Sequence, residues 1–369
     1  MAINKLVDHG EVYVIGQYEI GTSNPTSLYK IGIVQNDRST ESRVDEHQTG
    51  NPNRLFIAAK IPSEASYMVE QQMHKTWNSV RVGQEWFNLS NATDLAKVTG
   101  EIHALEALYG PQIVQLRSIY YTTPTPGENP TLTPAERTKA EHIRDEALDL
   151  TEQMALIKYR IDTYGFQLQI ANGMQPAMDS ITSCSIRPSK TEFKDSKLPA
   201  ALRTAFMTKP RKNKDDFRFN FVGVNANIDG LKLDDAHWKN KYPPEHQTWA
   251  TEKEAWKVMK ATITPATVNH AILNRTPTAE NLHQLYTDAR NEFNRLSAMR
   301  EVLQMECQLL CGDYEKIDAV CTWKRASQSN AFNLQEFKVH HPAEFANPAY
   351  QSTSAEGVAF KVNPYKTYR

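Results

Sequence analysis

Two short apolar runs near the N-terminus decide how this chain begins to fold: Glu-Val-Tyr-Val-Ile at residues 11–15 and Leu-Tyr-Lys-Ile-Gly-Ile-Val at residues 28–34. Both are rich in the β-branched and aromatic residues that strands prefer. The stretch Gly-Thr-Ser-Asn-Pro at residues 21–25 lies between them and is typical of a turn. We therefore expect the two runs to pair as an antiparallel hairpin.

A small mixed α/β domain with a three-stranded antiparallel sheet is expected to form around this hairpin. Its further elements are expected at residues 40–47 (helix), 55–61 (strand), 63–77 (helix) and 94–108 (helix). Arg43 and His47 are four residues apart on the first helix, and Glu70 and His74 are four apart on the second. Side chains at this spacing are neighbours on one helix face, so each pair is expected to point in one direction.

The charge balance excludes one simple class, a uniformly basic protein that binds nucleic acid by bulk charge. The 369 residues include 42 lysines and arginines against 43 aspartates and glutamates. Residues 1–100 carry 9 basic and 11 acidic residues, whereas residues 187–218 carry 10 basic and 4 acidic ones. The centre of this basic segment is Lys209, Arg211, Lys212 and Lys214. It either contacts nucleic-acid phosphates or forms a solubilising loop.

The sequence predicts a cytoplasmic protein without a membrane partner. No apolar run of about 18 residues is present to span a bilayer. Residues 1–5, Met-Ala-Ile-Asn-Lys, lack the apolar core of a signal peptide. Four cysteines are too few for a disulfide scaffold, which favours a reducing compartment.

A segment rich in proline and threonine, Tyr121–Thr133, disfavours a helix or a central strand and reads as a break between domains. The expected overall class is α+β. Its expected parts are a domain at residues 1–110, a linker at 111–133, a first unit at 134–230, a connector with a short helix at 231–272 and a second unit at 273–369.

The first unit begins with a long helix that carries a heptad seam. Thr133-Pro134 is a typical helix start and Asn172-Gly173 a typical end. The apolar residues between them alternate at spacings of four and three: Ile143, Ala147, Leu150, Met154, Ile157, Ile161, Tyr164 and Leu168. The same spacing recurs 139 residues later, from Leu282 to Cys307, with Arg300 as its polar member.

Other residues match at the same offset, which predicts that the two units are copies of one another. Gly173 corresponds to Gly312, and three phenylalanines, Phe193, Phe206 and Phe221, correspond to Phe332, Phe345 and Phe360. Each copy is expected to contain a long helix, a cysteine-containing strand, a short helical stretch and a closing strand of alternating pattern. The seams are expected to pack against each other within the chain or in a homodimer.

The N-terminal domain resembles the GIY-YIG nuclease superfamily, and most closely its T5orf172 branch. The residues that carry the resemblance are Val12-Tyr13, Lys30-Ile31-Gly32, Arg43, His47, Thr49-Gly50-Asn51-Pro52, Glu70 with His74, Arg81, and Glu85-Trp86-Phe87. Two positions depart from the wider superfamily: no glycine leads the first motif, and Lys30 stands where a tyrosine is usual. Lysine is common there in the T5orf172 branch. Asn88 is the candidate for the asparagine that closes the superfamily's site.

The resemblance implies a phosphodiester hydrolase with the catalytic residues Tyr13, Lys30, Arg43, His47 and Glu70. Tyr13 would orient or deprotonate a water, Arg43 would hold the scissile phosphate, and His47 would relay a proton or bind phosphate. Glu70 would hold one Mg²⁺ or Mn²⁺, whose other ligands are water and phosphate.

The secondary candidates are His74, Arg81 and Glu85, and each candidate also has a structural interpretation. Tyr13 and Trp86 fit an aromatic core, while the pairs Arg43 with His47 and Glu70 with His74 fit solvated helix faces. Glu85 either stabilises the fold or lines the site.

The C-terminal part of the second unit, from Cys321 to Val362, is similar to the tail that follows the nuclease core in YqaJ-type phage recombination exonucleases. The similarity implies a module shared within phage DNA metabolism and transfers no catalytic residue. Cys307 and Cys311 are four apart on a helix. They form either a zinc site with His340 and His341 or part of the apolar seam.

Two functions remain open from the sequence. The first is a phage-encoded, metal-dependent DNA endonuclease whose C-terminal units bind DNA or protein and select the target. The second is an inactive relative that binds nucleic acid or inhibits a host DNA-processing or defence factor, which the slight acidity of residues 1–100 favours. A purely structural coiled-coil protein would leave the N-terminal set of residues unexplained.

Overall fold

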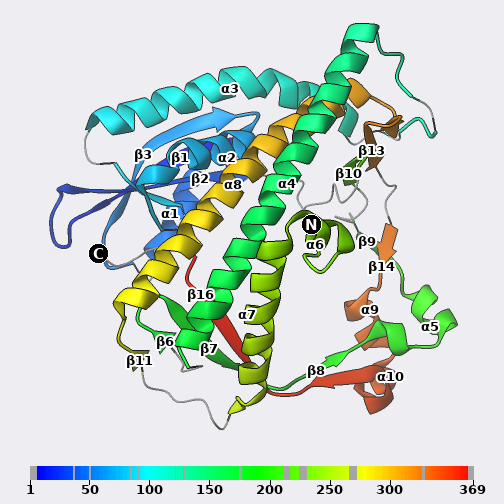
Figure 1. The fold of residues 1–369 in the computed structure, drawn as a ribbon. Coiled ribbons are helices and arrows are strands. Elements are labelled where there is room, and N and C mark those ends of the chain that lie inside the picture. The colour runs from blue at the N-terminus through cyan, green and yellow to red at the C-terminus, as the bar shows by residue number, and fades with distance from the viewer. Residues whose placement is uncertain are drawn as a thin grey trace.

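The computed structural model describes residues 6–35, 38–49, 51–83, 85–89, 92–120, 122, 124–127, 129–173, 177–211, 217–223, 231–265, 272–325 and 329–364. The protein has the predicted mixed α+β architecture, with an N-terminal antiparallel sheet and several long helices (Figure 1). None of the helices among these residues is long and apolar enough to cross a membrane.

The N-terminal sheet has five strands in the order β3-β1-β2-β5-β4, so the prediction of three strands was wrong in number. The expected strands are β1 (Gly10–Tyr18), β2 (Pro25–Gln35) and β3 (Leu55–Ser63), and the added ones are β4 (Arg81–Gly83) and β5 (Trp86–Asn88). β5 pairs with the outer edge of β2, where Tyr29 lies opposite Phe87. Burial of the whole Phe87 side chain favours this pairing.

Helices α1 (Thr40–Gln48), α2 (Ser66–Thr76) and α3 (Ala92–Tyr120) and the 3₁₀ turn η1 (Asn78–Val80) complete this region. α3 continues to Tyr120, well beyond the predicted end at Leu108 and through Pro111, so residues 111–120 of the expected linker are helical. The apolar stripe explains the extension, because Tyr109, Ile113, Leu116 and Tyr120 are all buried at helical spacing.

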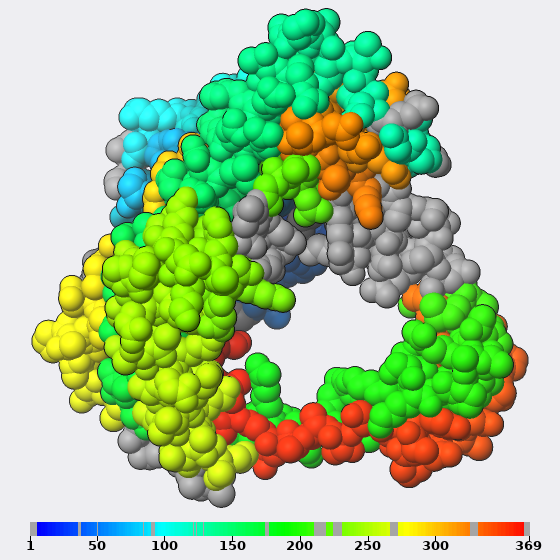
Figure 2. Space-filling model, turned by 45° about the vertical axis from the view of Figure 1, so that its right-hand side comes forward, coloured from blue at the N-terminus to red at the C-terminus, as the bar shows by residue number. Residues whose placement is uncertain are grey.

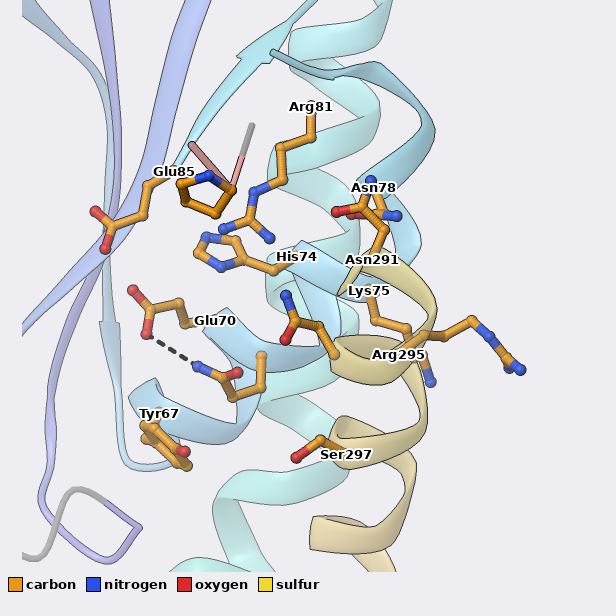
Figure 3. A pocket seen from close by; sticks show the side chains of 13 residues that line it. Tyr67, Glu70, His74, Lys75, Asn78, Arg81, Glu85, Asn291, Arg295 and Ser297 are labelled. Carbon is orange, nitrogen blue, oxygen red and sulfur yellow. Dashed lines mark hydrogen bonds between the residues drawn. The ribbon is translucent and has the colours of Figure 1, made fainter. Parts of the chain in front are cut away.

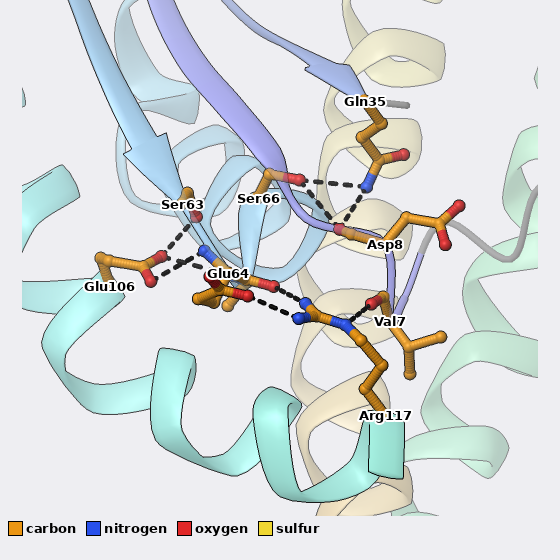
Figure 4. A network of polar contacts seen from close by, with 9 residues as sticks. Val7, Asp8, Gln35, Ser63, Glu64, Ser66, Glu106 and Arg117 are labelled. Carbon is orange, nitrogen blue, oxygen red and sulfur yellow. Dashed lines mark hydrogen bonds and ion pairs between the residues drawn. The ribbon is translucent and has the colours of Figure 1, made fainter. Parts of the chain in front are cut away.

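The start of α2 is held by side chains of α3 (Figure 4). The Glu106 carboxylate accepts hydrogen bonds from the backbone N–H of Glu64 at 2.9 Å and of Ala65 at 3.4 Å. Arg117 donates to the Glu64 carbonyl at 2.8 Å. A carboxylate at a helix N-terminus accepts hydrogen bonds from free N–H groups, and its negative charge interacts favourably with the positive end of the helix dipole. These contacts fix the position of the helix that carries Glu70.

Two long helices, α4 (Pro134–Ala171) and α8 (Pro277–Cys311), pack antiparallel in the middle of the molecule (Figure 1). α4 begins with a capping box in which Thr133 and Glu136 exchange hydrogen bonds. The predicted seams meet within the chain, because Leu150, Met154 and Leu296 share one buried cluster. The polar member Arg300 donates to Thr151 Oγ1 at 3.0 Å.

The two segments that follow the long helices have a similar order of elements: three strands, a short helical stretch and two closing strands. After α4 come β6 (Ala177–Met178), β7 (Thr182–Arg187), β8 (Lys190–Phe193), η2 (Asp195–Lys197), α5 (Ala200–Ala205), β9 (Lys209–Arg211) and β10 (Phe217–Phe221). After α8 come β12 (Lys316–Ile317), β13 (Cys321–Arg325), β14 (Ser329–Ala331), α9 (Leu334–His340), α10 (Pro342–Ala346), η6 (Pro348–Tyr350), β15 (Gln351–Ser354) and β16 (Gly357–Val362).

Besides the short pairings β6–β7 and β12–β13 within each segment, most strand pairs join one segment to the other. β7 pairs with β16 and β8 with β15, while β13 pairs with β10 and β14 with β9, all antiparallel. Backbone conformations recur at the 139-residue offset: φ is 56° at both Gly173 and Gly312, and it is 59° at Ser180 and 60° at Ala319. Each segment therefore completes the sheets of the other. Duplication of one ancestral unit stays a prediction.

Sequence-equivalent phenylalanines meet in a small aromatic lobe, formed by residues 190–211 and 329–354. Phe193 lies 6.0 Å from Phe332 and 5.2 Å from Phe345 between ring centroids, and Phe206 lies 6.3 Å from Phe332. Figure 2 shows this lobe standing apart from α7 (Pro243–Ala261) and joined to the main body along β8 and β15.

The connector at residues 231–272 contains more structure than the predicted short helix. It forms α6 (Ala236–Lys241), α7 and the short strand β11 (Ile272–Leu273). Trp238 and Trp249 are buried against Tyr159 of α4, whose hydroxyl donates to the Leu233 carbonyl at 2.6 Å. The connector therefore covers one face of α4.

One hydrophobic core joins the N-terminal sheet to the long helices. It contains Val12 of β1, Met68 of α2, Met305 of α8 and Trp323 of β13. Cys307, Cys311 and Cys321 are buried in the same core. The described residues contain no group of three or more side chains placed to hold a metal ion, so the zinc alternative receives no support.

Candidate active site

The candidate residues gather where the pairing of β2 with β5 ends. β5 pairs with β2 as far as Lys30. At the next residue, Ile31, the backbone N–H donates to the Glu85 carbonyl at 3.0 Å, and the carbonyl accepts from His74 Nε2 at 3.0 Å. The end of the strand pairing thus brings the loop containing Glu85 and the second half of α2 to one edge of the sheet.

One group of candidates lies on the face of the sheet covered by α1. Tyr13 of β1 is opposite Gly32 of β2 in the strand register. Its ring lies across that glycine, because a Cβ atom on Gly32 would be 2.5 Å from the Tyr13 hydroxyl oxygen. The Arg43 guanidinium hydrogen-bonds this hydroxyl and also donates to Glu46 Oε2 at 2.7 Å.

The phenol of Tyr13 is neutral at physiological pH. Its side chain is only 1% exposed. Burial raises the pKa of Tyr13 to about 12, and the nearby Glu85 and Glu70 carboxylates oppose the hydrogen bond from Arg43 that lowers it. Of the two roles expected for Tyr13, orientation of a water by the neutral hydroxyl fits this environment.

His47 on α1 presents a neutral imidazole. Burial lowers the pKa of His47, and the positive charges of Lys30 and Arg43 lower it further. Its Nε2 atom is buried and has no hydrogen-bond partner among the described residues. Because this nitrogen is closed to solvent here, it can accept a proton only after a local rearrangement admits a water beside it.

Lys30 is buried and forms an ion pair with Glu85. Burial raises the pKa of Glu85, but the charge and the hydrogen bond of Lys30 outweigh it and leave the pKa below its ordinary value. The pair therefore connects the α1 side of the sheet to the cavity described next. The pair also limits Lys30 to a positioning role, because the Glu85 carboxylate already compensates the charge of the Lys30 ammonium group.

The second group lines a cavity of about 430 Å³ between α2 and α8. Figure 3 shows the carboxylate ends of Glu70 and Glu85 on the sheet side of this cavity, with Asn291 and Ser297 of α8 opposite them. His74 and Arg81 also line it, whereas Tyr13, Lys30, Arg43 and His47 lie beyond its wall. Glu70 and Glu85 connect the two groups, because the negative charges of both carboxylates raise the pKa of Tyr13.

His74 holds the strand edge and has little protonation chemistry to offer at neutral pH. Burial lowers its pKa to about 4, and the charge of Arg81 lowers it further. Because the Ile31 carbonyl can only accept a hydrogen bond, the Nε2 atom of the neutral ring carries the proton. The ring also packs on Phe87 at 5.3 Å between centroids.

Glu70 has the chemistry of a ligand for one hard divalent ion. Its side chain is 8% exposed and reaches the cavity from α2. Mg²⁺ is usually held by one or two carboxylates while water and phosphate fill its other positions. Since Glu85 is paired with Lys30, the residues fit an ion bound by Glu70 and the substrate, and they do not fit a site built from protein ligands alone.

The wall formed by α8 was not predicted from the sequence. Asn291, Asn294, Arg295 and Ser297 of this helix line the cavity together with Asn78 of η1. The docking of α2 on α8 places them there, with hydrogen bonds from Gln72 Nε2 to the Ala298 carbonyl at 3.2 Å and from the Tyr67 hydroxyl to Glu301 Oε1 at 3.1 Å. Asn78 could have been found, because it continues the four-residue spacing of Glu70 and His74.

The other candidates fall elsewhere. Lys209 and Arg211 belong to β9 in the aromatic lobe and do not line the cavity, and Lys212 and Lys214 lie outside the described residues. Asn88 is exposed on β5 and does not line the cavity. His340 and His341 pack on Phe206 in the aromatic lobe.

Gly32 provides the first test of this geometry. The Gly32→Ala variant is expected to lose about 1–3 kcal/mol of unfolding free energy, because the added methyl group forces the buried Tyr13 ring to move. Urea unfolding measures the change. Gly100→Ala on α3 is the matched control, since its added methyl group would meet no atom within 4 Å and alanine favours a helix. Equal stability of the two variants would contradict the assigned position of Tyr13.

Residues 10–103 match the family model of the T5orf172 domain. This match supports the resemblance of the N-terminal domain and is consistent with a nuclease-like or DNA-binding domain. It covers β1 through the first part of α3 and does not extend to the long helices or their strands. No curated protein and no solved structure matches the chain.

Proposed function

We propose, from the T5orf172 domain at residues 10–103 and the site geometry, that the protein is a metal-dependent DNA endonuclease of the GIY-YIG type. The observation that carries the proposal is the electrostatic link between two neighbouring groups: Tyr13, Arg43 and His47 lie on the α1 side of the sheet, and the charge of Glu70, from the adjoining cavity, acts on Tyr13. Phosphodiester hydrolysis needs an oriented water, a proton acceptor and positive charge at the phosphoryl oxygens. These four side chains provide an arrangement suited to each task.

The steps follow from the protein's own groups. Arg43 keeps donors beyond those used by Tyr13 and Glu46, and these hold the scissile phosphate. The Tyr13 hydroxyl orients the attacking water, and His47 Nε2 accepts its proton. Mg²⁺ or Mn²⁺ on Glu70 would neutralise charge on the phosphate and the leaving oxygen.

The remaining parts of the chain are assigned to target selection. We propose that residues 134–230 and 273–369 are two copies of one phage-type module, which joins the nuclease to its DNA or protein target. Lys209 and Arg211 contribute phosphate contacts in this proposal. The expected location is the cytoplasm of a host bacterium, because the resemblances are to phage proteins.

The deciding experiment is a nicking assay on supercoiled plasmid. The wild-type protein with Mg²⁺ or Mn²⁺ is expected to convert the plasmid to open circles, and excess chelator is expected to stop the conversion. Absence of nicking over a range of metals and DNA forms would favour the alternative, a protein that binds nucleic acid or a host factor without cutting. The ion pair between buried Lys30 and half-buried Glu85 favours that alternative, since it compensates the charge of a cation close to the proposed phosphate position.

The pH dependence of nicking tests the role of His47. Because His47 must be neutral to accept a proton, the rate should rise with pH through its pKa and stay level above it. The acid limb should lie below the ordinary histidine value, since burial and two cations lower this pKa. His47→Ala should lose about 10²-fold or more in rate and also lose the acid limb. An unchanged acid limb in this variant would assign the titration to another group.

A further inference from the structure

A second cavity extends the candidate active site along α8. It has a volume of about 450 Å³ and shares Asn78, Arg81, Asn291 and Pro364 with the first cavity. The two therefore form one trough, bounded by α8 on one side and by α2, η1 and β4 on the other. On α8 it runs from Gln284 to Ser297, a length of about 20 Å at 1.5 Å per residue. That length accommodates several nucleotides.

Carboxamide side chains line the centre of this trough. Asn78, Asn291 and Asn294 all face the first cavity. Figure 3 shows Asn78 and Asn291 at the same end of it. None of the three side chains has a hydrogen-bond partner within the part of the chain that the structure describes. Their donors and acceptors are therefore available to a ligand.

The equivalent helix shows that these amides are not needed for packing. At the 139-residue offset, Asn291 corresponds to Glu152 of α4 and Asn294 corresponds to Ala155. Ala155 is buried in the cluster formed with α6 and α7, and Glu152 is paired with Lys241. On α4, the face that carries Glu152 and Ala155 is covered by α6 and α7. On α8, the face that carries Asn291 and Asn294 borders the trough instead.

The charges of the trough suit bases better than phosphates. Its cations are Lys75, Arg81 and Arg295, and its anions are Glu70, Glu85, Asp288 and Glu292. Arg295 is also engaged by Glu292 at 2.6 Å. A lining without excess positive charge attracts a phosphate backbone weakly. Neutral carboxamides instead offer paired donors and acceptors that match base edges, as asparagine does with adenine.

We infer that Asn291 and Asn294 of α8, with Asn78, contact bases of the DNA strand that enters the cavity lined by Glu70, and set the sequence preference of the enzyme. The inference rests on the proposed function, because it takes DNA as the ligand of the same site. It gives the second unit a direct part in substrate recognition. The nuclease domain would then depend on a helix nearly two hundred residues away in sequence for its specificity.

A selection experiment tests this role without requiring cleavage. A randomised duplex DNA pool is bound to the full-length protein with Ca²⁺ in place of Mg²⁺, and the bound fraction is sequenced. The wild-type protein should enrich particular bases about tenfold at one or more positions. The double variant Asn291→Ala/Asn294→Ala should lose this enrichment while its affinity for the whole pool and its salt dependence change little, since no charge is removed.

Two further variants make the result specific. Asn281→Ala, at an exposed position of α8 outside both cavities, should select the wild-type sequences. Asn78→Ala, on the opposite wall, should weaken the preference without changing α8, and thermal unfolding confirms that each variant is folded. Retained enrichment in the double variant, or no enrichment by the wild-type protein, would overturn the inference. If the wild-type protein enriches particular bases but does not nick plasmid, the result would support base contacts by these amides and reject the proposed nuclease activity.

Discussion

Glu70→Ala should reduce plasmid nicking by about 10³-fold or more, the largest effect expected of any single substitution in this protein. Glu70 is the one carboxylate of the cavity wall on α2, and its neighbour Glu85 is occupied by Lys30. Removal of the Glu70 side chain would therefore leave the metal without a carboxylate ligand from the protein. The loss should persist at high Mg²⁺ or Mn²⁺ concentration and at saturating DNA.

Matched variants separate this role from a general effect of charge or folding. Glu70→Gln keeps the size of the side chain and should be nearly as inactive, because a neutral amide binds a hard cation weakly. Glu19→Gln, at an exposed position in the turn between β1 and β2, should nick like the wild-type protein. Arg43→Ala should also lose nicking. Substantial activity in Glu70→Gln would show that the carboxylate is not the metal ligand.

Glu301→Gln should stabilise the folded protein by about 3 kcal/mol at pH 8 and hardly at all at pH 4.5. Glu301 lies in the contact between α8 and α2, where its Oε1 accepts a hydrogen bond from Tyr67 and its Oε2 is buried without a partner among the described atoms. Burial raises the pKa of Glu301 from 4.5 to about 7, against the lowering effects of the Tyr67 hydrogen bond and the Arg300 charge.

The sign follows from proton binding. Between pH 4.5 and about 7 the unfolded chain has released the Glu301 proton while the folded protein retains it. The free energy of unfolding contributed by this group therefore falls as the pH rises through that window, and glutamine removes the dependence. Urea unfolding of both proteins at pH 5, 6, 7 and 8 measures it. Glu146→Gln, at an exposed position of α4, is the control. Parallel pH curves for wild-type protein and Glu301→Gln would contradict the burial of this carboxyl group.

The prediction for Glu301 also concerns the candidate active site, because α2 carries Glu70 and is held by α8 at Tyr67 and Gln72. The wall opposite Glu70 belongs to the second C-terminal unit. A cut of the chain between the N-terminal domain and the long helices would therefore remove half of the cavity and expose apolar core shared by both parts. Residues 10–103, which match the family model, form one wall of the candidate cavity. The opposite wall belongs to α8, which lies outside the matched residues.

Local patterns were sufficient to locate most elements. Apolar runs rich in β-branched and aromatic residues identified β1 and β2, a further run identified β3, the Thr133-Pro134 start and the heptad spacing identified α4, and the same spacing 139 residues later identified α8. The short strands β4 and β5 were missed, since three-residue runs have no measurable period. The end of α3 was placed at Leu108, whereas Tyr109, Ile113, Leu116 and Tyr120 continue the buried stripe and carry the helix through Pro111 to Tyr120.

The sequence by itself determined the set of candidate side chains, because the resemblance to the GIY-YIG superfamily and its T5orf172 branch rests on short motifs that contain Tyr13, Arg43, His47 and Glu70. Only the tertiary structure decided their environment. Burial raises the pKa of Tyr13 and lowers that of His47, strand pairing produces the Lys30–Glu85 pair, and the packing of α2 on α8 produces the amide wall. Burial and long-range packing depend on residues far apart in the chain, and no period within one element encodes them.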